Sequence, residues 1–417
     1  MANFLLLQGV CSPFFRLLAR ALKGDGHTVG KLAFTGGDVA SSFGIKTVRC
    51  NVPSAQLLDF FRTYYRRESV TDIVVFGDTR PVHVPAIQAA KASGVRVHVF
   101  EEGYFRPYWV TLERGGVNGR SVLPTCPEWF KEAGRLVPHY GDGRPFHAPF
   151  VHRAWHDVVY HCNGVWNTLL FSKYKSHIDF TAPQEYWAYV RSYLRRYRSQ
   201  TAFQQIVTDL LSGDKPFYLL PLQLAYDSQI RHNSRFRSVE DVIDHVVQSF
   251  ARHAPAQTYL VVKAHPLDPG FVDHAQSLMN ASRAAGVEHR VVFIEAGAMP
   301  HLLDRCSGVV CVNSTVGASA LIHGRKTVAL GAAIYDLPGL TFQGGLDDFW
   351  TDASSPDMVL LRRFRDVVIH TTQINGGFYS GQGMAMLVDN CKDELYAPES
   401  ALERLIGMVA GQTCAFL

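Results

Sequence analysis

The sequence predicts an α/β protein with two Rossmann-type domains, whose mostly parallel sheets face a central cleft. The chain has 417 residues, which is too long for one ordinary hydrophobic core, so two domains are expected. Units of strand, polar loop and helix recur in two series, as they do in α/β folds. The strand Val95–Phe100 is too apolar to have one wet face, which is typical of a parallel sheet covered on both sides.

The first series begins with the strand Phe4–Leu7 and an amphipathic helix over 14–22, which Gly24 ends. Further strands are expected at Thr28–Phe34, Asp72–Phe76 and Val95–Phe100. A polar loop follows each of these three strands, and ligands of such sheets bind beyond the carboxyl ends of the strands. The loops carry the following candidates: Gly36, Gly37 and Asp38; Gly77, Asp78 and Arg80; Glu101 and Glu102.

The second series starts at Pro216. Its expected strands are Phe217–Leu222, Tyr259–Lys263, Val291–Ile294, Gly308–Val312 and Thr327–Leu330. Ser238 and Asp241 have the spacing of a capping box before a helix over 240–252. Between the two series, Trp187–Arg198 predicts a basic, aromatic helix. We therefore expect a first domain over 1–170, bridging helices and a second domain over 171–350, and a helical segment over 351–417 that packs back on the first domain.

Composition excludes several classes of function. The 41 basic and 37 acidic residues give a formal net charge of +4, which is too small to argue for a nucleic-acid partner. The eight cysteines show no CxxC spacing, so neither a zinc site nor a disulfide framework is expected, and a reducing cytoplasm fits. The Leu5–Leu7 run is too short for an export signal, and no apolar stretch approaches the roughly 20 residues that span a bilayer.

Glu102 is the candidate general base, with Glu101 as its structural neighbour, because both follow a buried strand. A solvated acidic turn is the alternative, since carboxylates with perturbed pKa values also occur in structural ion pairs. Asp347 and Asp348 are adjacent like Glu101 and Glu102, so their side chains tend to diverge, and no metal site is expected.

Two loops of the second series could hold a phosphate. Ser314 and Thr315 open a helix after a buried strand, where backbone N–H groups favour an anion, although a plain N-cap explains them too. Lys263 and His265 leave the neighbouring strand and could stabilise a leaving phosphate, although His265 could equally be a hydrogen-bonded loop histidine. There is no Walker loop and no GxGxxG after the first strand, so nucleoside triphosphates and dinucleotides are weak candidates.

Three aromatic and basic runs, Phe60–Arg67, Tyr186–Arg198 and Leu360–Arg365, allow two interpretations. Arginines that extend over the edge of a core are the ordinary one. Docking on an anionic membrane surface is the other, because clustered Lys and Arg each contribute about 1 kcal/mol near such a lipid surface.

Eight segments, in order through most of residues 1–345, resemble the bacterial capsule polysaccharide biosynthesis and export family. More narrowly, they resemble its single-module S-type members, regarded as β-Kdo transferases. The matching segments are Leu6–Gly9 with Pro13–Phe15, Phe34–Asp38, Phe76–Pro81, Phe100–Pro107, Trp109–Asn118, Pro221–Gln229, Lys263–Asp268 and Val312–Gly317.

This resemblance implies a GT-B-like fold and metal-independent, inverting transfer of Kdo, an eight-carbon acidic keto-sugar. The implied donor is CMP-Kdo, no cofactor is needed, and the acceptor is a lyso-phosphatidylglycerol-type lipid. A cytoplasmic protein peripheral to the inner membrane, working with other capsule synthesis and export proteins, follows from that activity. The rivals are another GT-B sugar-nucleotide transferase or epimerase that uses a UDP-sugar, and a non-catalytic component of the export machinery.

The resemblance also implies roles for individual residues. Glu102 falls on the acidic position of the family's acidic-Gly-aromatic motif and His265 on its nucleotide-side histidine, so these are the catalytic candidates. The residues expected to bind sugar or acceptor are Gln8, Gly9, Gly37, Asp38, Asp78, Arg80, His83, Glu101, Arg106, Gln223, Asp227 and Gln229. Those expected to bind the nucleotide are Lys263, His265, Pro266, Asp268, Glu295, Asn313, Ser314, Thr315 and Gly317. Relatives with an EDG-type motif have Asp in place of Glu102, so Asp38, Asp78 and Asp227 are reserve candidates for the base.

Overall fold

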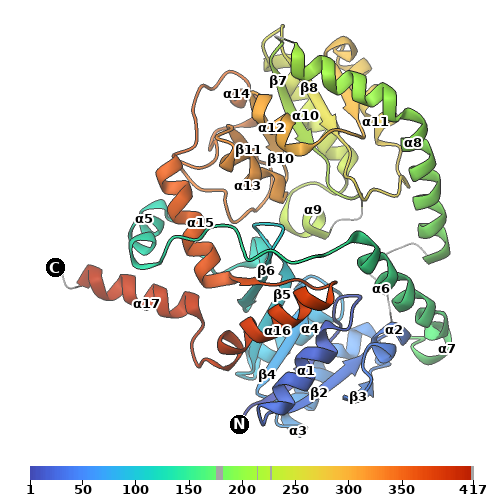
Figure 1. Cartoon of the computed structure of the whole chain (residues 1–417), viewed down its shortest axis with the longest axis vertical. Coiled ribbons are helices and arrows are strands. Elements are labelled where there is room, and N and C mark those ends of the chain that lie inside the picture. Colours follow the sequence, from blue (N-terminus) through green and yellow to red (C-terminus); the bar gives the residue numbers. More distant parts are fainter. Residues whose placement is uncertain (175–181, 214, 226–227, 415–417) are drawn as a thin grey trace. The chain divides into compact units, whose positions relative to one another are not determined.

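Two mostly parallel sheets, each in its own unit, confirm the predicted α/β fold class (Figure 1). The computed structural model describes residues 1–174, 182–213, 215–225 and 228–414. Unit 1 comprises Met1–Pro124, Glu132–His177 and Phe364–Leu417, and unit 2 comprises Thr125–Lys131 and Ile178–Arg363.

Unit 1 is built on a seven-stranded sheet of order β12-β6-β5-β4-β1-β2-β3. The strands are β1 (Asn3–Leu6), β2 (Thr28–Ala33), β3 (Lys46–Arg49), β4 (Asp72–Phe76), β5 (Arg96–Glu102), β6 (Trp109–Arg114) and β12 (Gln373–Asn375). The first five in sequence pair in parallel, whereas β6 and β12 add an antiparallel edge. The expected strand over 95–100 therefore extends through both glutamates.

Helices cover both faces of this sheet because its central strands are apolar on both sides. The elements of unit 1 outside the sheet are α1 (Phe14–Gly24), α2 (Gly36–Ala40), η1 (Ser54–Gln56), α3 (Leu57–Arg67), α4 (His83–Ala92), η2 (Asn118–Arg120), α6 (Phe150–Asn163), η3 (Gly164–Trp166), α7 (Asn167–Leu170), α16 (Gly381–Tyr396) and α17 (Ala401–Cys414). One face packs on α3 and α4, and the other packs on α1 and α16, which lie side by side (Figure 1).

Unit 2 is built on a five-stranded parallel sheet of order β11-β10-β7-β8-β9. Its strands are β7 (Phe217–Pro221), β8 (Tyr259–Lys263), β9 (Val291–Ile294), β10 (Gly308–Cys311) and β11 (Thr327–Ala329). Its other elements are α8 (Ala182–Ser212), α9 (Ser228–Asn233), α10 (Val239–His253), α11 (His274–Ala284), η4 (Glu288–Arg290), α12 (Met299–Arg305), α13 (Thr315–Ile322) and α14 (Leu346–Phe349). Two further helices, α5 (Pro127–Leu136) and α15 (Met358–Thr372), each contain one of the four points where the chain passes between units.

Helix starts follow the capping rules, with one difference from the sequence prediction. Ser238 caps α10 by accepting a hydrogen bond from the Asp241 N–H at 3.2 Å, as expected. The Asp241 carboxylate, however, accepts from the Arg237 N–H, so the reciprocal bond of a capping box is not formed there. The complete capping box lies at α2, between Thr35 and Asp38.

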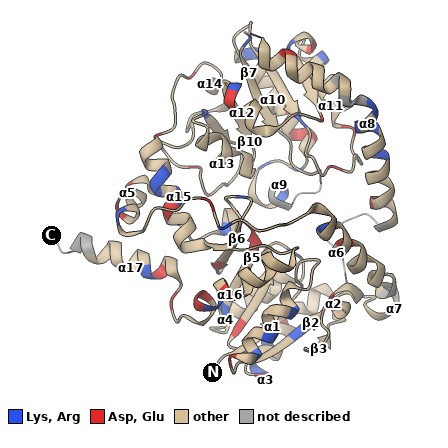
Figure 2. Ribbon diagram, in the orientation of Figure 1, with Lys and Arg blue, Asp and Glu red and all other residues tan. Residues whose placement is uncertain are grey.

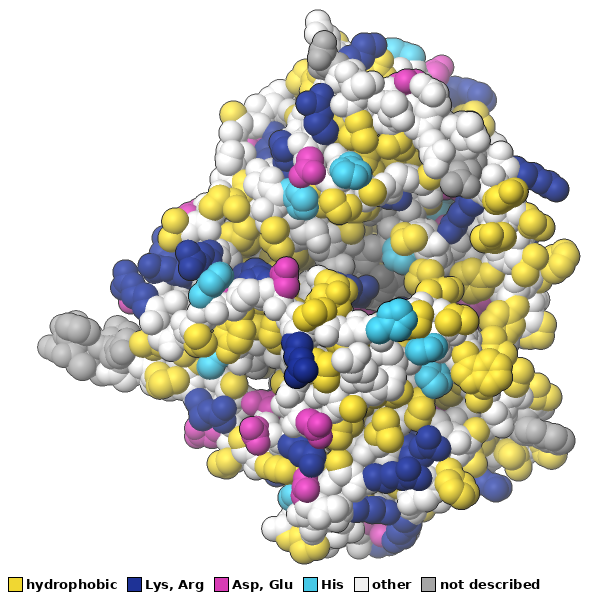
Figure 3. All heavy atoms as spheres, viewed as in Figure 1, with side chains coloured by type: hydrophobic (Ala, Val, Ile, Leu, Met, Phe, Trp, Pro, Cys, Tyr) yellow, Lys and Arg dark blue, Asp and Glu magenta, His cyan; other side chains and the backbone are white. Residues whose placement is uncertain are grey.

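The aromatic and basic runs differ from one another in the structure. Phe61, Tyr64 and Tyr65 of α3 are core residues, as are Leu360 and Phe364 of α15, which supports the ordinary interpretation for those two runs. The predicted helix Trp187–Arg198 is confirmed as part of α8, where Trp187 and Tyr197 are exposed. Figure 2 shows the charged residues and Figure 3 the apolar side chains at the surface. Among the described residues, none of the helices has the length and apolarity required to span a bilayer.

Replacing Phe378 by Ala should destabilise unit 1 by about 3–5 kcal/mol, the usual cost of deleting a buried ring. Phe378 lies between β12 and α16, and its ring centroid lies 5.2 Å from that of Phe14 and 5.1 Å from that of Phe76. Urea unfolding measures the change, and Met408→Ala on the exposed side of α17 is the control. An unchanged midpoint for Phe378→Ala would contradict this packing.

Candidate functional site

The first candidate site lies where the strand order of unit 1 reverses direction. From β1 the sheet grows through β2 and β3 on one side and through β4 and β5 on the other. In open α/β sheets ligands bind in the crevice at such a switch point. The loops that follow β1 and β4 meet there, because Arg80 Nη1 donates a hydrogen bond to the Gly9 carbonyl at 2.9 Å. Arg80 and Gly9, both sugar or acceptor candidates, are thus brought together at this edge.

Glu101 and Glu102 point to opposite faces of β5, as successive residues of a strand must. Glu101 Oε1 accepts a hydrogen bond from the Glu102 N–H at 3.0 Å, and its other oxygen approaches Gly77. Burial raises the pKa of Glu101 to about 7, while Arg80 and Arg106 lower it in part. A carboxyl group with such a pKa marks a candidate functional site, so Glu101 is more than a passive neighbour of Glu102.

Glu102 has two partners that the sequence analysis missed. The Tyr379 hydroxyl donates to Glu102 Oε1 at 3.4 Å, and the Arg153 guanidinium lies 3.9 Å from the same oxygen. Arg153 also stacks over the Tyr379 ring, 4.7 Å from its centroid. Burial, together with the charge of Glu102, raises the pKa of Tyr379 well above its usual value, so this hydroxyl keeps its proton. Because both partners lie far from Glu102 in the chain, no local sequence signal could have identified them.

Gln8 and Asp38 belong to one buried hydrogen-bonded group, which Gly37 adjoins. Asp38 Oδ2 accepts from the backbone N–H groups of Phe34 and Thr35, and its Oδ1 accepts from the Tyr160 hydroxyl at 3.1 Å. Gln8 Nε2 donates to the Tyr174 hydroxyl at 3.1 Å. A side chain at Gly37 would meet the Tyr160 ring at 2.7 Å. These contacts position α2 and α6, so Asp38 is already fully engaged and is a weak reserve candidate for the base.

Asp78, His83 and Arg106 hold the loops around Glu101. Asp78 Oδ2 accepts from the Val117 N–H at 3.1 Å, and burial raises the pKa of this carboxyl. The His83 Nδ1–H donates to the Gly77 carbonyl at 2.7 Å, which orients the ring. Arg106 is exposed, and its Nε donates to the Gly103 carbonyl at 3.4 Å. Of the three, Arg106 is the side chain most accessible to a ligand.

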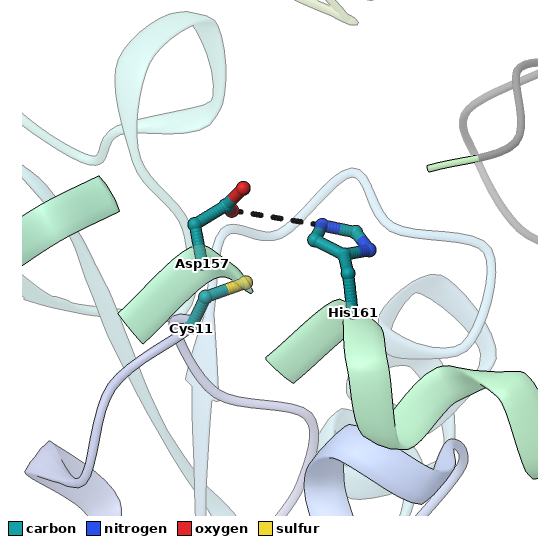
Figure 4. A group of neighbouring side chains, drawn as sticks. All are labelled: Cys11, Asp157 and His161. Carbon is teal, nitrogen blue, oxygen red and sulfur yellow. Dashed lines mark ion pairs between the residues drawn. The ribbon is translucent and has the colours of Figure 1, made fainter. Parts of the chain in front are cut away.

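Cys11, Asp157 and His161 are the residues that could hold a metal in the described part of the chain (Figure 4). Asp157 and His161 lie one turn apart on α6, with 3.6 Å between Oδ1 and Nε2, and one potential ligand atom from each of the three residues lies within 4.8 Å of the others. Burial raises the pKa of the Cys11 thiol to about 12, although the positive charges of Arg80 and Arg153 lower it in part. Zinc requires a thiolate, and two nearby guanidinium groups disfavour a cation, so these side chains fit a metal poorly.

The second candidate site lies at the corresponding point of unit 2. Its strand order reverses between β7 and β10, and each is followed by a polar loop. Gln223 follows β7 and Asn313 follows β10, and they bond to each other: Gln223 Nε2 donates to Asn313 Oδ1 at 3.0 Å, and the Asn313 N–H donates to Gln223 Oε1 at 3.3 Å. Two residues predicted from separate sequence segments thus meet at this switch point. Asp227 and the side chain of Gln229 lie outside the described part of the structure.

Lys263 is the last residue of β8, and His265 and Asp268 follow it at the same edge. Burial and the charge of Arg196 lower the pKa of Lys263, and a bound phosphate would favour its charged form again. His265 Nδ1 accepts a hydrogen bond from the Leu267 N–H at 3.1 Å, so in the neutral ring the proton lies on Nε2, which can donate. Burial would raise the pKa of Asp268, but hydrogen bonds from His274 and Gly270 outweigh it and lower the pKa. Asp268 therefore stabilises the loop that carries His265.

Glu295 and Pro266 connect this edge to α8. Glu295 Oε1 lies 2.9 Å from Arg195 Nη2, and its Oε2 lies 3.7 Å from Arg196 Nε. Arg196 also donates to the carbonyls of Pro266 and Asp268. Two of the arginines in the predicted basic helix are thus used to hold the helix against its own unit, which leaves them poorly placed for lipid phosphates.

Ser314, Thr315 and Gly317 form the start of α13. Ser314 is its N-cap and accepts from the Val316 N–H at 3.2 Å, so the capping interpretation is confirmed. A side chain at Gly317 would meet the Tyr335 hydroxyl at 2.2 Å, and that hydroxyl donates to the Ser314 carbonyl at 2.6 Å. Capping engages the Ser314 side chain with the helix, while the Thr315 side chain is half-buried at the same helix end. Phosphate binding at the start of α13 stays a prediction. A cleft shared by Glu102 and the second site also stays a prediction, because the two sites belong to different units.

The chain is similar in sequence to proteins named for capsule polysaccharide synthesis, export and modification. Residues 71–379 match the family model described as capsule polysaccharide biosynthesis protein. The capsule polysaccharide export protein KpsS of Escherichia coli is 35% identical over 379 residues, which cover 90% of this chain and 97% of that protein. The capsule polysaccharide modification protein LipB of Neisseria meningitidis serogroup A is 35% identical over 384 residues, covering 91% and 92%. A solved structure titled Thermosulfurimonas dismutans KpsC, beta Kdo 2,7 transferase, aligns with a TM-score of 0.46 and 13% identity, covering 98% of this chain and 99% of that chain.

Replacing Glu101 by Gln should flatten the pH dependence of stability. Because burial raises the pKa of Glu101 from 4.5 to about 7, the folded chain keeps a proton that the unfolded chain releases, and stability falls as pH rises through that range. The neutral side chain removes this loss, worth roughly 1–3 kcal/mol at pH 8. Urea unfolding at pH 5 and pH 8 measures the effect, with Glu132→Gln on the surface as the control. Identical pH dependence in the wild type and Glu101→Gln would show that Glu101 ionises freely.

Proposed function

This chain belongs to the capsule polysaccharide biosynthesis family, and from that membership we propose that it is an inverting glycosyltransferase that transfers Kdo from CMP-Kdo. The acceptor is a lyso-phosphatidylglycerol-type lipid, and the product begins the linker that carries the capsular polysaccharide. The observation that carries the proposal is the carboxylate of Glu102 at the crevice edge of β5, flanked by Arg153 and Tyr379. The similarity to proteins named for capsule export and modification supports a place in capsule assembly.

The reaction requires a base for the acceptor and a stabilised leaving group. In this proposal Glu102 takes the proton from the acceptor hydroxyl as its oxygen attacks the anomeric carbon. The bond from that carbon to the CMP phosphate breaks, and its electron pair leaves with CMP. Attack on the face opposite to CMP inverts the anomeric configuration. Arg153 lies beside Glu102, where it could also meet an anionic group of the acceptor.

The nucleotide is held by unit 2. The Nε2–H of His265 would donate to the departing phosphate, and Lys263 and the start of α13 would add positive charge. Fixed donors of this kind stabilise negative charge as it develops, without a metal ion. Glu101 and Arg106 lie on the acceptor side of unit 1, where a protonated Glu101 could donate a hydrogen bond to the sugar or acceptor.

Replacing Glu102 by Gln should reduce Kdo transfer by about 10²–10⁴-fold, the usual contribution of a positioned base, and leave CMP-Kdo binding nearly unchanged. The assay incubates the protein with CMP-Kdo and a fluorescent lyso-phosphatidylglycerol analogue and detects the product by mass spectrometry. Glu132→Gln is the control. Full activity of Glu102→Gln would reject the assignment. A product of retained configuration, or a sugar bound covalently to Glu102, would make this residue a nucleophile instead of a base.

Replacing His265 by Ala should weaken CMP binding by about 10- to 100-fold, because a hydrogen bond to a charged group contributes about 1.5–3 kcal/mol. Calorimetry measures the affinity, and the exposed His289→Ala is the control. A thermal-shift panel of nucleotides should show stronger stabilisation by CMP than by UDP. Preference for UDP would favour a UDP-sugar enzyme, and no turnover with any donor would favour a non-catalytic export component.

A further inference from the structure

Helix α6 presents an apolar stripe to solvent. Val151, Trp155, Val158 and Val159 recur at spacings of three and four residues, so they share one face of the helix. Trp155 is 65% exposed and Val151 is 64% exposed. Phe150, the first residue of the helix, is exposed beside the stripe, and two further exposed apolar side chains, Val165 and Leu169, follow beyond the helix. In a surface helix such a stripe normally faces the core, so its outward position needs an explanation.

The other face of α6 is polar and is held by unit 1. Tyr160 packs against Gly37 and donates to Asp38, and Arg153 lies between Glu102 and the Tyr379 ring. Turning α6 to bury the stripe would break these contacts and leave buried polar groups without them. The helix is therefore fixed with its apolar side outward, and the exposure is part of the fold.

We propose that this α6 stripe docks unit 1 on the surface of an anionic phospholipid bilayer; the inference rests on the proposed function, whose acceptor is a lipid. Residues 143–174 contain three basic residues (Arg144, Arg153 and Lys173) and one acidic residue (Asp157), so their formal charge is 3 − 1 = +2. The same segment contains four histidines. Figure 2 shows few charged residues on α6 and α7, and Figure 3 shows apolar side chains gathered in this region with histidines beside them.

The apolar and basic side chains of the α6 region are typical of a helix that lies on a lipid bilayer, and less typical of a helix exposed to water. An interfacial helix buries an apolar face that contains Trp or Phe at the boundary between headgroups and acyl chains, while basic groups nearby meet the headgroups. Trp155 provides an aromatic anchor on the stripe, and Phe150 is exposed at the start of the helix. The exposed Arg144 and Lys173, near the two ends of the segment, provide basic groups for the headgroups. Arg153 lies on the face of α6 turned toward unit 1 and approaches Glu102 to 3.9 Å, so docking through α6 would hold the reacting carboxylate close to the bilayer that contains the lipid acceptor.

Vesicle sedimentation tests the proposal with the full chain and without any sugar donor. The wild type should bind vesicles that contain phosphatidylglycerol and bind neutral phosphatidylcholine vesicles weakly. Val151→Ser combined with Trp155→Ser should weaken binding by roughly 10- to 100-fold, because two exposed apolar anchors are lost. Trp187→Ser, an equally exposed tryptophan on α8, is the matched control and should bind like the wild type. Equal losses in the two variants, or no loss in the α6 variant, would overturn the proposal.

Two exposed cysteines locate the contact. Cys162 continues the α6 stripe, seven residues after Trp155, whereas Cys126 lies in unit 2. Each is labelled in turn with an environment-sensitive fluorophore, the other being replaced by serine, with Cys11 and Cys414 replaced by serine in both proteins. Anionic vesicles should shift the emission of the label at Cys162 to the blue and leave the label at Cys126 unchanged. The reverse pattern would overturn docking through α6.

Sedimentation velocity separates a lipid surface from a second copy of this chain. A dimer that Trp155→Ser dissociates, with vesicle binding unchanged, would assign the stripe to self-association and reject the proposal. Failure of the proposed function is distinguishable. Vesicle binding without Kdo transfer would support docking and reject the proposed transferase activity. Transfer to a soluble short-chain acceptor without vesicle binding would support the transferase activity and reject docking.

Discussion

The close contact between α2 and α6 fixes most of the candidate site in unit 1. A side chain at Gly36 would meet the Asn163 carbonyl at 2.1 Å, and one at Gly37 would meet Tyr160 at 2.7 Å, so this approach requires glycine at both positions. Once α6 is held there, Tyr160 reaches Asp38 and Arg153 reaches Glu102. The same contact determines which side of α6 faces outward. The packing of α2 against α6 thus determines which charged group lies beside Glu102, and it determines that α6 presents an apolar surface to solvent.

In unit 2, different residues join the loops at the switch point of the sheet. The reciprocal hydrogen bonds of Gln223 and Asn313 join the loops on the two sides of its switch point, as Arg80 and Gly9 do in unit 1. Around them, Asp268 and the Leu267 N–H hold the loop of His265 and fix its neutral tautomer. These hydrogen bonds hold the polar groups of the site in place. A site organised in this way can bind charge without rearranging.

Much of this architecture could be predicted from the sequence. Buried parallel strands such as β4, β5 and β8 are continuous apolar runs followed by polar loops, and they were recognised on that basis. The strands β3, β6 and β12 were missed. β3 is largely exposed and β12 has three residues, so neither shows a hydrophobic period, and β6 contains the buried polar residues Thr111 and Glu113 among its apolar ones. For the candidate site, the sequence predicted only that it is formed by polar loops at the carboxyl ends of strands. Arg153 and Tyr379 could not be predicted, because their contacts with Glu102 depend on how distant segments pack.

Unit 1 is discontinuous, and this has a consequence for the newly made chain. Phe378 and α16 cover the sheet face that carries Phe100, beside Phe14 of α1, yet they are synthesised after the whole of unit 2. Unit 2 lies wholly upstream of that stretch and can reach its native state first. Until Phe378 and α16 have been synthesised, this sheet face exposes aromatic side chains to solvent, which makes the nascent protein a client for chaperones. A stop codon introduced before Phe378 would leave the face exposed and so promote aggregation.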